Sequence, residues 1–386
     1  MKRIFHLFSL TILLTLMVAT PAMASSSGPA LTKVSPPLPS GWNQGYLYGV
    51  WGSNATNLYS VGDGYNGKTY MPLIYHSAGG AWKVISSTMP SGWTYGWLRS
   101  IWGSSSSNIL AVGTGEQGGP DLPLIYHLIT GNVLKVSSPA MPSGFTTGGL
   151  YGVWGSRANN EYVVGYGYNG TAELPLIYQS TVIGGWNVFS PAMPSGFTAG
   201  TLNSVWGSGD SGNVYAVGYG WNAILPIPLV YHKYGSVWKA IAPPLPTGWT
   251  AGWLNGVYVP SAGYVVAVGS GYIGTAQVPL VYHSNNGSIW TVSSLPIPSG
   301  WSDIFLRGIW GSDASNEYAV GSGYNGTTYM PLLYHYNGTA WTFFTPAVRS
   351  GENEGELWGV WGSSAANVYM VGEGDNGTTW LPLIYH

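Results

Sequence analysis

The sequence contains no cysteine, so no disulfide bond can hold this protein together. Charged residues make up only 7% of its 386 residues, whereas aromatic residues make up 15%. A nucleic-acid-binding protein normally carries a basic patch, and the scarcity of Lys and Arg excludes that class. So aromatic and so weakly charged a chain is also not intrinsically disordered. We therefore expect a globular protein that is stabilised by its hydrophobic core.

Long hydrophobic runs are also scarce, because the sequence has only one, at its start. Lys2 and Arg3 precede an apolar run over residues 7–18, and Ala22-Met23-Ala24 supplies the small residues of a cleavage site. This pattern predicts a secretory signal peptide over residues 1–24. With no second long run, we expect no membrane insertion and a secreted or periplasmic protein. The remaining chain has 10 basic and 14 acidic residues.

The feature that dominates the sequence is a motif repeated seven times with a spacing of 51 or 52 residues. Each copy begins near Val-Trp-Gly-Ser, continues through Val-Gly-x-Gly, which we interpret as a turn, and ends near Pro-Leu-Ile-Tyr-His. The first aromatic residue of each copy serves as its anchor; the anchors are Trp51, Trp102, Trp154, Trp206, Tyr258, Trp310 and Trp361. A period of this length, made of short apolar runs and Gly, Pro and Asn turns, predicts a β-propeller.

The first copy predicts four strands, over residues 47–52, 58–61, 73–76 and 82–85. The middle two are almost continuously apolar, as expected for strands buried on both faces between neighbouring blades. The fourth alternates apolar residues with Lys83, and a charge on an exposed edge prevents pairing with another molecule. The fold class is therefore all-β: a seven-bladed β-propeller of four-stranded antiparallel blades.

The two ends of the chain predict how the ring closes. The seventh copy stops at Tyr385-His386, which completes only a third strand. The missing fourth strand occurs at the other end, where Thr32-Lys33-Val34 matches Trp82-Lys83-Val84. We therefore predict that an N-terminal strand completes blade seven, so that residues 25–386 form a single propeller domain.

The motif string Val-Trp-Gly-Ser, Asn-x-Tyr-x-Val-Gly and Tyr-His-x-x-Gly-x-x-Trp resembles the repeats of bacterial secreted propellers grouped with the kelch and galactose-oxidase-like families. The resemblance covers all seven copies. It departs from true kelch repeats, which carry a Gly-Gly pair where this chain has Val-Gly-x-Gly. The resemblance implies a secreted propeller and leaves the activity open, because that family is functionally mixed.

Two sets of aromatic residues recur in loops that should emerge on one face of the ring. The loop before each inner strand carries Trp42, Trp93, Phe145, Phe197, Trp249 and Trp301, and the loop between the second and third strands carries Tyr65, Tyr168, Trp221, Tyr272 and Tyr324. Aromatic rings beside Asn side chains suit sugar binding, because a pyranose ring stacks on them while its hydroxyls bond to amides. The alternative is that these rings only pack the loops onto the blades.

A further variable position lies three residues before each anchor and should face the central channel. Its residues are Tyr48, Arg99, Tyr151, Asn203, Asn255, Arg307 and Trp358. Arg99 and Arg307 are candidates to hold an anionic group, and the alternative is that they fill a solvated channel.

Acidic residues gather where blade seven meets blades one and two. The candidate cation ligands are Asp63, Glu352, Glu373 and Asp375, with Glu354, Glu356, Glu116 and Asp121 nearby in the repeat. Loop carboxylates could hold Ca²⁺, the one cofactor that the sequence suggests. No DxDxDG-type spacing is present, however, and a solvated acidic patch is the alternative.

The histidines and the scarcity of catalytic residues bear on function. Every His after residue 24 occupies the same repeat position, at His76, His127, His232, His283, His335 and His386, with Gln179 in the third copy; we interpret them as strand-end hydrogen-bonding groups. We assign no catalytic residue. The sequence favours a secreted, non-enzymatic, lectin-like protein that binds a glycan. The alternatives are a protein-interaction scaffold of the cell envelope, with another secreted protein as partner, and a glycan-acting hydrolase or lyase.

Overall fold

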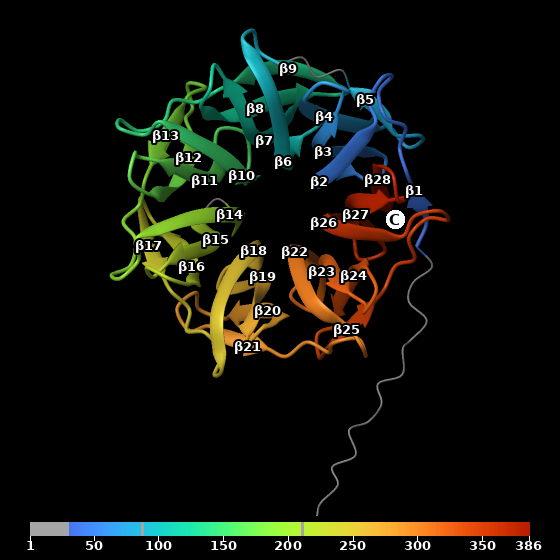
Figure 1. Ribbon diagram of the computed structural model, residues 1–386. Helices are drawn as coiled ribbons and strands as arrows, with labels where there is room; N and C mark the ends of the chain where they lie inside the picture. The colour runs from blue at the N-terminus through green and yellow to red at the C-terminus, as the bar shows by residue number, and fades with distance from the viewer. Residues whose placement is uncertain (1–30, 86–88, 210–211) are drawn as a thin grey trace, which may run out of the picture. The chain divides into compact units, whose positions relative to one another are not determined.

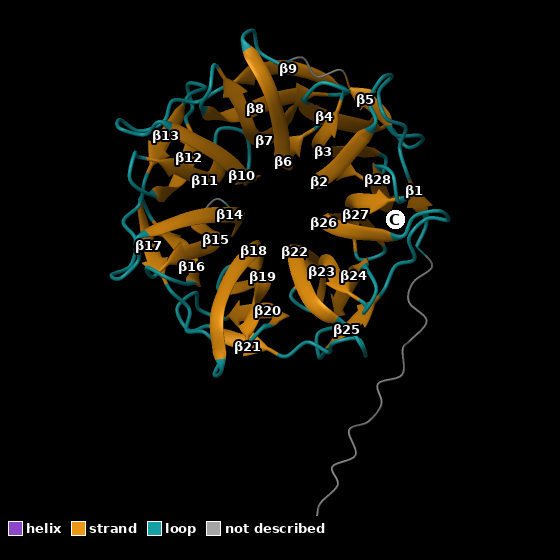
Figure 2. Cartoon of the chain, in the orientation of Figure 1, coloured by secondary structure: helices purple, strands orange, loops and turns teal. Residues whose placement is uncertain are grey.

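The computed structural model describes residues 31–85, 89–209 and 212–386, and residues 31–386 belong to one compact unit. The predicted signal peptide over residues 1–24 lies outside the described residues. All regular secondary structure in the described part of the chain is β-strand (Figure 2). That part accordingly contains no helix long and apolar enough to cross a membrane.

The strands form seven separate four-stranded antiparallel sheets, which lie as blades around a common axis in Figure 1. This arrangement confirms the predicted seven-bladed propeller. The innermost strands of blades one to seven are β2 (Gln44–Asn54), β6 (Trp93–Ser105), β10 (Thr147–Gly155), β14 (Ala199–Ser208), β18 (Trp249–Ser261), β22 (Ser302–Asp313) and β26 (Glu354–Ser364).

The remaining strands follow outward in chain order within each blade. The second strands are β3 (Asn57–Tyr65), β7 (Asn108–Gln117), β11 (Glu161–Tyr168), β15 (Asn213–Trp221), β19 (Tyr264–Ile273), β23 (Asn316–Tyr324) and β27 (Asn367–Asp375). The third strands are β4 (Tyr70–Ser77), β8 (Asp121–Ile129), β12 (Glu173–Ser180), β16 (Pro226–Tyr234), β20 (Ala276–Ser284), β24 (Tyr329–Tyr336) and β28 (Trp380–Tyr385). The outer strands are β5 (Lys83–Ile85), β9 (Asn132–Ser137), β13 (Trp186–Phe189), β17 (Val237–Ile241), β21 (Thr291–Ser293), β25 (Trp341–Phe344) and β1 (Lys33–Val34).

The N-terminal strand closes the ring as predicted. β1 pairs antiparallel with β28, with Lys33 opposite Tyr385 and Val34 opposite Ile384. Thr32 and His386 exchange two further backbone hydrogen bonds of 2.7 and 2.8 Å. Strands from the two ends of the sequence therefore share blade seven, and the ring has no unpaired blade at the joint.

Five of the six anchor tryptophans pack against a glycine of the next blade, and Trp206 instead meets Tyr258. A Cβ atom built on Gly103 would lie 2.7 Å from the ring of Trp51, and one on Gly155 would lie 2.8 Å from the ring of Trp102. The same contact joins Trp310 to the Gly that follows the anchor of blade seven. The Trp and Gly residues thus act as a pair: the indole ring of one blade fills the space that a side chain at the Gly of the next blade would occupy.

The Val-Gly-x-Gly motif is not the turn that the sequence suggested, because it lies inside each second strand. In blade one it occupies positions within β3, and the strand continues to Tyr65. A Cβ atom on Gly62 would come within 1.8 Å of the carbonyl oxygen of Tyr46 on the inner strand. The first glycine is therefore required for close backbone approach, and the strands are longer than the apolar runs indicated.

Candidate functional site

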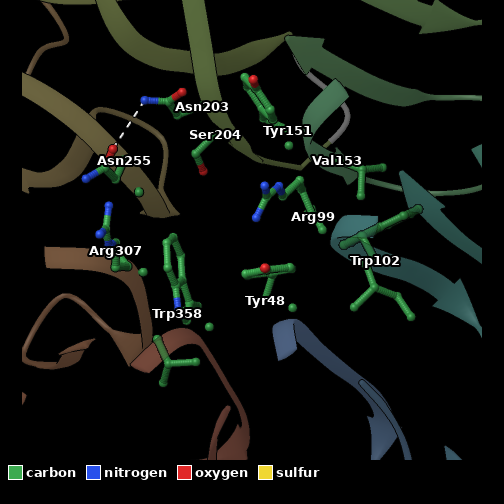
Figure 3. Close-up of a pocket in the computed structure, with 18 of the residues that line it drawn as sticks. Tyr48, Arg99, Trp102, Tyr151, Val153, Asn203, Ser204, Asn255, Arg307 and Trp358 are labelled. Carbon is green, nitrogen blue, oxygen red and sulfur yellow. Dashed lines mark hydrogen bonds between the residues drawn. The ribbon is translucent and has the colours of Figure 1, made fainter. Parts of the chain in front are cut away.

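A cavity of about 380 Å³ lies on the axis of the ring, between the inner strands of all seven blades. Its wall includes all seven residues at the variable position three before the anchor, so this predicted channel ring exists. Figure 3 shows these labelled side chains turned toward the space between the strands. Because each blade contributes one residue at the same height, seven side chains of different type surround one cavity.

Four of the seven side chains form a continuous row of contacts, in which two aromatic rings lie between two arginines. The guanidinium carbon of Arg307 lies 4.2 Å from the ring centre of Trp358, and that of Arg99 lies 4.2 Å from the ring centre of Tyr48. Trp358 and Tyr48 meet edge to face, with ring centres 5.2 Å apart. This charged–aromatic half of the wall spans blades six, seven, one and two, and its cation–π contacts fix both arginines against flat rings.

The other three side chains form a neutral half of the wall over blades three to five. Asn203 Nδ2 donates to the carbonyl of Leu254 at 2.8 Å, and Asn255 Nδ2 donates to the carbonyl of Leu306 at 2.7 Å. Asn203 Nδ2 also lies 3.2 Å from Asn255 Oδ1 (Figure 3). Each amide therefore ties its own blade to the next one as well as facing the cavity.

Carboxyl groups stand behind the charged–aromatic half. Trp358 Nε1 donates to Glu373 Oε1 at 2.7 Å, and Arg307 Nη2 lies 3.8 Å from Glu356 Oε2. Asp63 accepts a hydrogen bond from Tyr48, and Arg99 acts on it electrostatically. The arginines are thus held between aromatic rings in front and acids behind.

Burial changes the protonation of these acids. Burial raises the pKa of Asp63 to about 6, although Arg99 and Tyr48 oppose the shift. Burial also raises the pKa of Glu356, against the lowering effect of Arg307. The pKa of Glu373 lies well above its usual value because of burial, with Glu356 adding to the effect. Burial therefore favours the neutral form of each of these acids, and a neutral carboxyl group does not balance the charge of a neighbouring arginine.

The four proposed cation ligands do not gather at one site. Asp63 and Glu373 occupy the x position of Val-Gly-x-Gly and lie buried behind the channel wall, not in exposed loops. Glu352 packs on Gly374 and accepts from the backbone N–H of Arg349 at 2.8 Å. Asp375 accepts from the N–H of Gly377 in its own turn at 3.0 Å. Across the described ranges, no group of three or more His, Asp or Glu side chains is placed to hold a metal ion.

The aromatic residues of the first loop set face their own blades. Trp42, Trp93, Trp249 and Trp301 are half-buried, each against the second glycine of the Val-Gly-x-Gly motif. A Cβ atom on Gly64, for example, would lie 2.5 Å from the ring of Trp42. This contact occupies one face of each ring, as the packing alternative described.

The second loop set is more accessible but dispersed over separate blades. Its five candidates are half-buried or exposed, with Tyr168 and Trp221 exposed by 36% and 38%. Register pairs such as Gln44 with Tyr65 place the two loop sets at the same end of the strands, as predicted. These rings lie one to a blade, so the structure does not bring them together as it does the channel ring.

The histidines are local groups in five of the blades. In those five, His Nε2 lies within hydrogen-bonding distance of the Asn Oδ1 that is 19 positions earlier, at His76–Asn57, His127–Asn108, His232–Asn213, His335–Asn316 and His386–Asn367. Gln179 bonds instead to the hydroxyl of Tyr162 at 3.0 Å. His283 of blade five follows neither pattern.

Sequence reasoning missed that the x of Val-Gly-x-Gly contributes to the site. Its residues are Asp63, Thr114, Tyr166, Tyr219, Ser270, Ser322 and Glu373. Tyr166 stacks on Tyr151 with ring centres 5.5 Å apart, and Glu373 bonds to Trp358. The variety of residues at this position is visible in the sequence. If the motif is assigned to a strand, this variety indicates a second set of site residues, behind the channel ring.

Comparison with known proteins supports the fold. No protein-family model matches the sequence, and no curated protein matches it. Among solved structures, YCF48 from Cyanidioschyzon merolae is similar with a TM-score of 0.52 and 14% identity, covering 92% of this chain and 98% of that one. An ulvan lyase of polysaccharide lyase family PL25 has a TM-score of 0.50 and 9% identity, covering 76% and 79%. At these identities the similarity establishes a shared propeller fold.

Proposed function

We propose that this protein is a lectin-like propeller that binds a saccharide in its axial cavity. The observation that carries the proposal is the channel ring, in which aromatic rings, amides and two arginines meet around one space of about 380 Å³. Pockets for small ligands usually measure about 300–1,000 Å³ and combine apolar walls with a few polar groups. The exposed loop aromatics, in contrast, lie one to a blade.

The wall offers the three kinds of contact that a saccharide uses. Tyr48, Tyr151 and Trp358 provide ring faces and edges for the apolar side of a pyranose. Asn203 and Asn255 provide amides for its hydroxyls. The cavity can therefore bind a sugar without any contribution from the exposed aromatic residues of the loops.

Two arginines in the same wall favour an acidic saccharide. Arg99 and Arg307 both line the cavity, and the Nε of Arg307 is buried without a hydrogen-bond partner. A guanidinium group binds carboxylate or sulfate through paired hydrogen bonds. A uronic acid or a sulfated sugar would meet both the rings and these cations.

The shared fold is compatible with this role. The ulvan lyase with a similar fold has also been solved bound to -[GlcA(1-4)Rha3S]-, a saccharide with a uronic acid and a sulfate ester. The signal sequence expected over residues 1–24 would place this chain outside the cytoplasm, where such glycans occur. We therefore propose a glycan as the partner of this protein, which would bind it without catalysing a reaction. The competing hypothesis is that the protein is a scaffold for another secreted protein.

A glycan array that includes neutral and acidic saccharides tests the proposal. We expect binding to acidic glycans, with affinity reduced at least about tenfold in Arg99→Gln and in Arg307→Gln. Lys68→Gln removes one exposed positive charge and should leave binding unchanged, and Trp221→Ala tests the loop face. Melting curves check that each variant folds. No binding to any glycan, or binding lost only in Trp221→Ala, would overturn the axial site.

A further inference from the structure

A second cavity, of about 220 Å³, opens between blades five and six, away from the axial site. The side chains that matter in its wall are Tyr264, His283, Asn285, Glu317, Tyr336 and Trp341. Tyr264 and His283 belong to β19 and β20 of blade five, and the last three belong to β23, β24 and β25 of blade six. We refer to this cavity as the side pocket.

The side pocket exists because blade five lacks a tyrosine that other blades use as a bridge. In blade one, Tyr59 accepts a hydrogen bond from the N–H of Gly131 in blade two at 2.8 Å. In blade six, Tyr318 donates to the carbonyl of Ala365 in blade seven at 3.3 Å. Blade five has Val266 at this position, opposite Tyr258 in the register. Val is too short to reach the next blade, so the space between blades five and six stays open.

A second departure in the same blade changes the polar groups around the opening. Tyr264 stands where the other blades have the Asn that pairs with His. His283 therefore bonds to the hydroxyl groups of its outer strand, with Nδ1 3.1 Å from Ser293 Oγ and Nε2 2.8 Å from Thr291 Oγ1. Burial lowers the pKa of His283, which favours its neutral form.

Glu317 of blade six is the buried charged group of the side pocket. Its side chain is only 1% exposed, it accepts a hydrogen bond from Tyr264, and its Oε1 atom has no hydrogen-bond partner. Burial raises the pKa of this carboxyl to about 8, and the nearby Asp313 adds to the shift. A buried carboxyl with a free oxygen that lines a cavity is costly unless a ligand completes it.

Blade three contains the matched case in which no ligand is needed. Glu161 occupies the position equivalent to Glu317, and Leu110 of blade two replaces the bridging tyrosine as Val266 does. There, Asn108 Nδ2 of blade two donates to Glu161 Oε1 at 2.9 Å. In the side pocket Tyr264 occupies the position of that Asn and donates to Glu317, yet Oε1 of Glu317 is buried without a hydrogen-bond partner, which is not the case for Glu161.

The remaining walls combine two aromatic rings with Val266, Val281, Asn285 and Ser293, and they carry no positive charge. The rings of Tyr336 and Trp341 lie 5.3 Å apart, tilted by 35°. No Lys or Arg is among the described residues that line the side pocket. The titratable groups that face Glu317 are Tyr264 and Tyr258 of the blade-five strands β19 and β18, together with His283 and Tyr336 in the pocket wall, and Asp313 acts from nearby. Aromatic faces around a carboxylate form the environment that binds ammonium groups.

We propose that the side pocket binds a small organic cation, such as a quaternary ammonium group, with Glu317 as its counter-ion and Trp341 and Tyr336 as its aromatic walls. The site is independent of the axial cavity and of its saccharide. It is created by the replacements that distinguish blade five from its neighbours.

This site links cation binding to proton release. The cation pairs with the ionised carboxylate, whereas Glu317 is largely protonated in the empty protein below pH 8. Affinity should therefore rise about tenfold per pH unit up to about pH 8 and then level off. A permanently charged ligand does not titrate itself, so this pH dependence reports on the protein.

Calorimetric titration of the full chain with tetramethylammonium chloride at constant ionic strength, from pH 6 to pH 9, tests the proposal. Titration in buffers of different ionisation enthalpy should show proton release near pH 7. Glu317→Gln keeps the side-chain shape and should lose affinity at least about tenfold at pH 8.5, whereas Glu161→Gln should bind as the parent does. tert-Butanol, a neutral molecule of similar shape, should bind more weakly.

Three results would overturn the proposal: no tetramethylammonium binding at pH 9, equal binding by Glu317→Gln, or equal binding of tert-butanol. Glu317→Gln keeps the size of the side chain and cannot ionise, and a melting curve of the variant separates loss of binding from loss of folding. Thermal melts across the same pH range add an independent readout. The raised pKa lowers the stability of the parent as pH rises from about 4.5 to 8, and Glu317→Gln should remove that decline.

Discussion

The two halves of the channel wall are built on the same backbone and have different chemistry. Blades six, seven, one and two contribute Arg307, Trp358, Tyr48 and Arg99, whose rings and cations stack on one another. Blades three to five contribute Tyr151, Asn203 and Asn255, whose amides bond to neighbouring strands. The contrast extends beyond the channel, because the sequence between Glu173 and Asp303 contains only three charged residues, Asp210, Lys233 and Lys239.

This difference shows how a repeat protein acquires a site. The glycines and anchor residues that set blade geometry stay almost constant, so each blade presents its variable positions at the same height and depth. A change at one such position therefore alters the chemistry of one sector without altering the ring. Within the channel wall, the positive charges of Arg99 and Arg307 are confined to the half that has the buried acids Asp63 and Glu373 and the partly buried Glu356 behind it.

The joint of the ring lies in the charged–aromatic half. Deleting its N-terminal strand should reduce the free energy of unfolding more than any other change proposed for the protein. Deleting residues 25–38 removes β1 together with Leu31 and Leu38, which pack on the cores of blades seven and one. Loss of two partly buried leucines and the strand's hydrogen bonds should cost on the order of 5 kcal/mol. Differential scanning calorimetry measures the loss.

Deletion of residues 25–30 alone retains β1 and is the matched control for this experiment. An unchanged melting temperature after deletion of residues 25–38 would show that the N-terminal strand does not hold the ring closed.

The first glycine of the Val-Gly-x-Gly motif should be equally important for stability in both halves of the ring. A Cβ atom on Gly218 of blade four would lie 2.0 Å from the carbonyl oxygen of Thr201, and one on Gly372 of blade seven would lie 1.9 Å from that of Glu356. Each Gly→Ala variant must push two strands apart, so both should lose about 4 kcal/mol or more in urea unfolding.

Gly80→Ala places its Cβ atom in open space and should be neutral. If Gly218→Ala were tolerated while Gly372→Ala was not, the two halves would differ in framework as well as in side chains.

Arg307→Asn places in blade six the residue that blades four and five already carry, and the pH dependence of its effect separates the loss of charge from the loss of packing on Trp358. Glu356 then loses its cation, and its pKa rises further above the unfolded value. The ionised form is therefore penalised more in the folded state. Unfolding at pH 8 should show a loss of about 1–2 kcal/mol, and the loss should shrink as the pH falls toward 4, where Glu356 is protonated in both states.

The second change Glu356→Gln should restore much of the stability of Arg307→Asn at pH 8. In the neutral half, Asn203→Ala removes a hydrogen bond to Leu254 and should cost about 1 kcal/mol at either pH. A loss in Arg307→Asn that does not depend on pH would mean that packing on Trp358, and not charge, explains the role of Arg307.

The fold was largely predictable because its signals are local and repeated. The period predicted the blades, and the match of Thr32-Lys33-Val34 to Trp82-Lys83-Val84 predicted the joint. The Val-Gly-x-Gly motif was misassigned to a turn because its glycines resemble turn glycines in sequence. Their actual requirement is close contact with the inner strand, which a single strand's sequence does not reveal.

The site was predictable only in part. The channel ring and its two arginines follow from the repeat register, whereas the roles of the acids do not. Asp63 and Asp375 look alike in the sequence, yet one is buried behind the channel wall and the other caps a turn. Position along the strand separates them, since Asp63 lies inside β3 beside the inner strand, whereas Asp375 is the last residue of β27 and begins the turn.

The sequence by itself determined the number of blades, the closing strand and the positions that vary, because these depend on spacing along the chain. The tertiary structure alone decided which variable residues meet, since contacts across blades join positions about 50 residues apart. For this reason Arg307 reaches Glu356 in the next blade, and Glu317 receives a hydrogen bond from Tyr264 where Glu161 receives one from Asn108. Burial between blades then set the charge of those carboxyl groups, because desolvation acts only in the assembled ring.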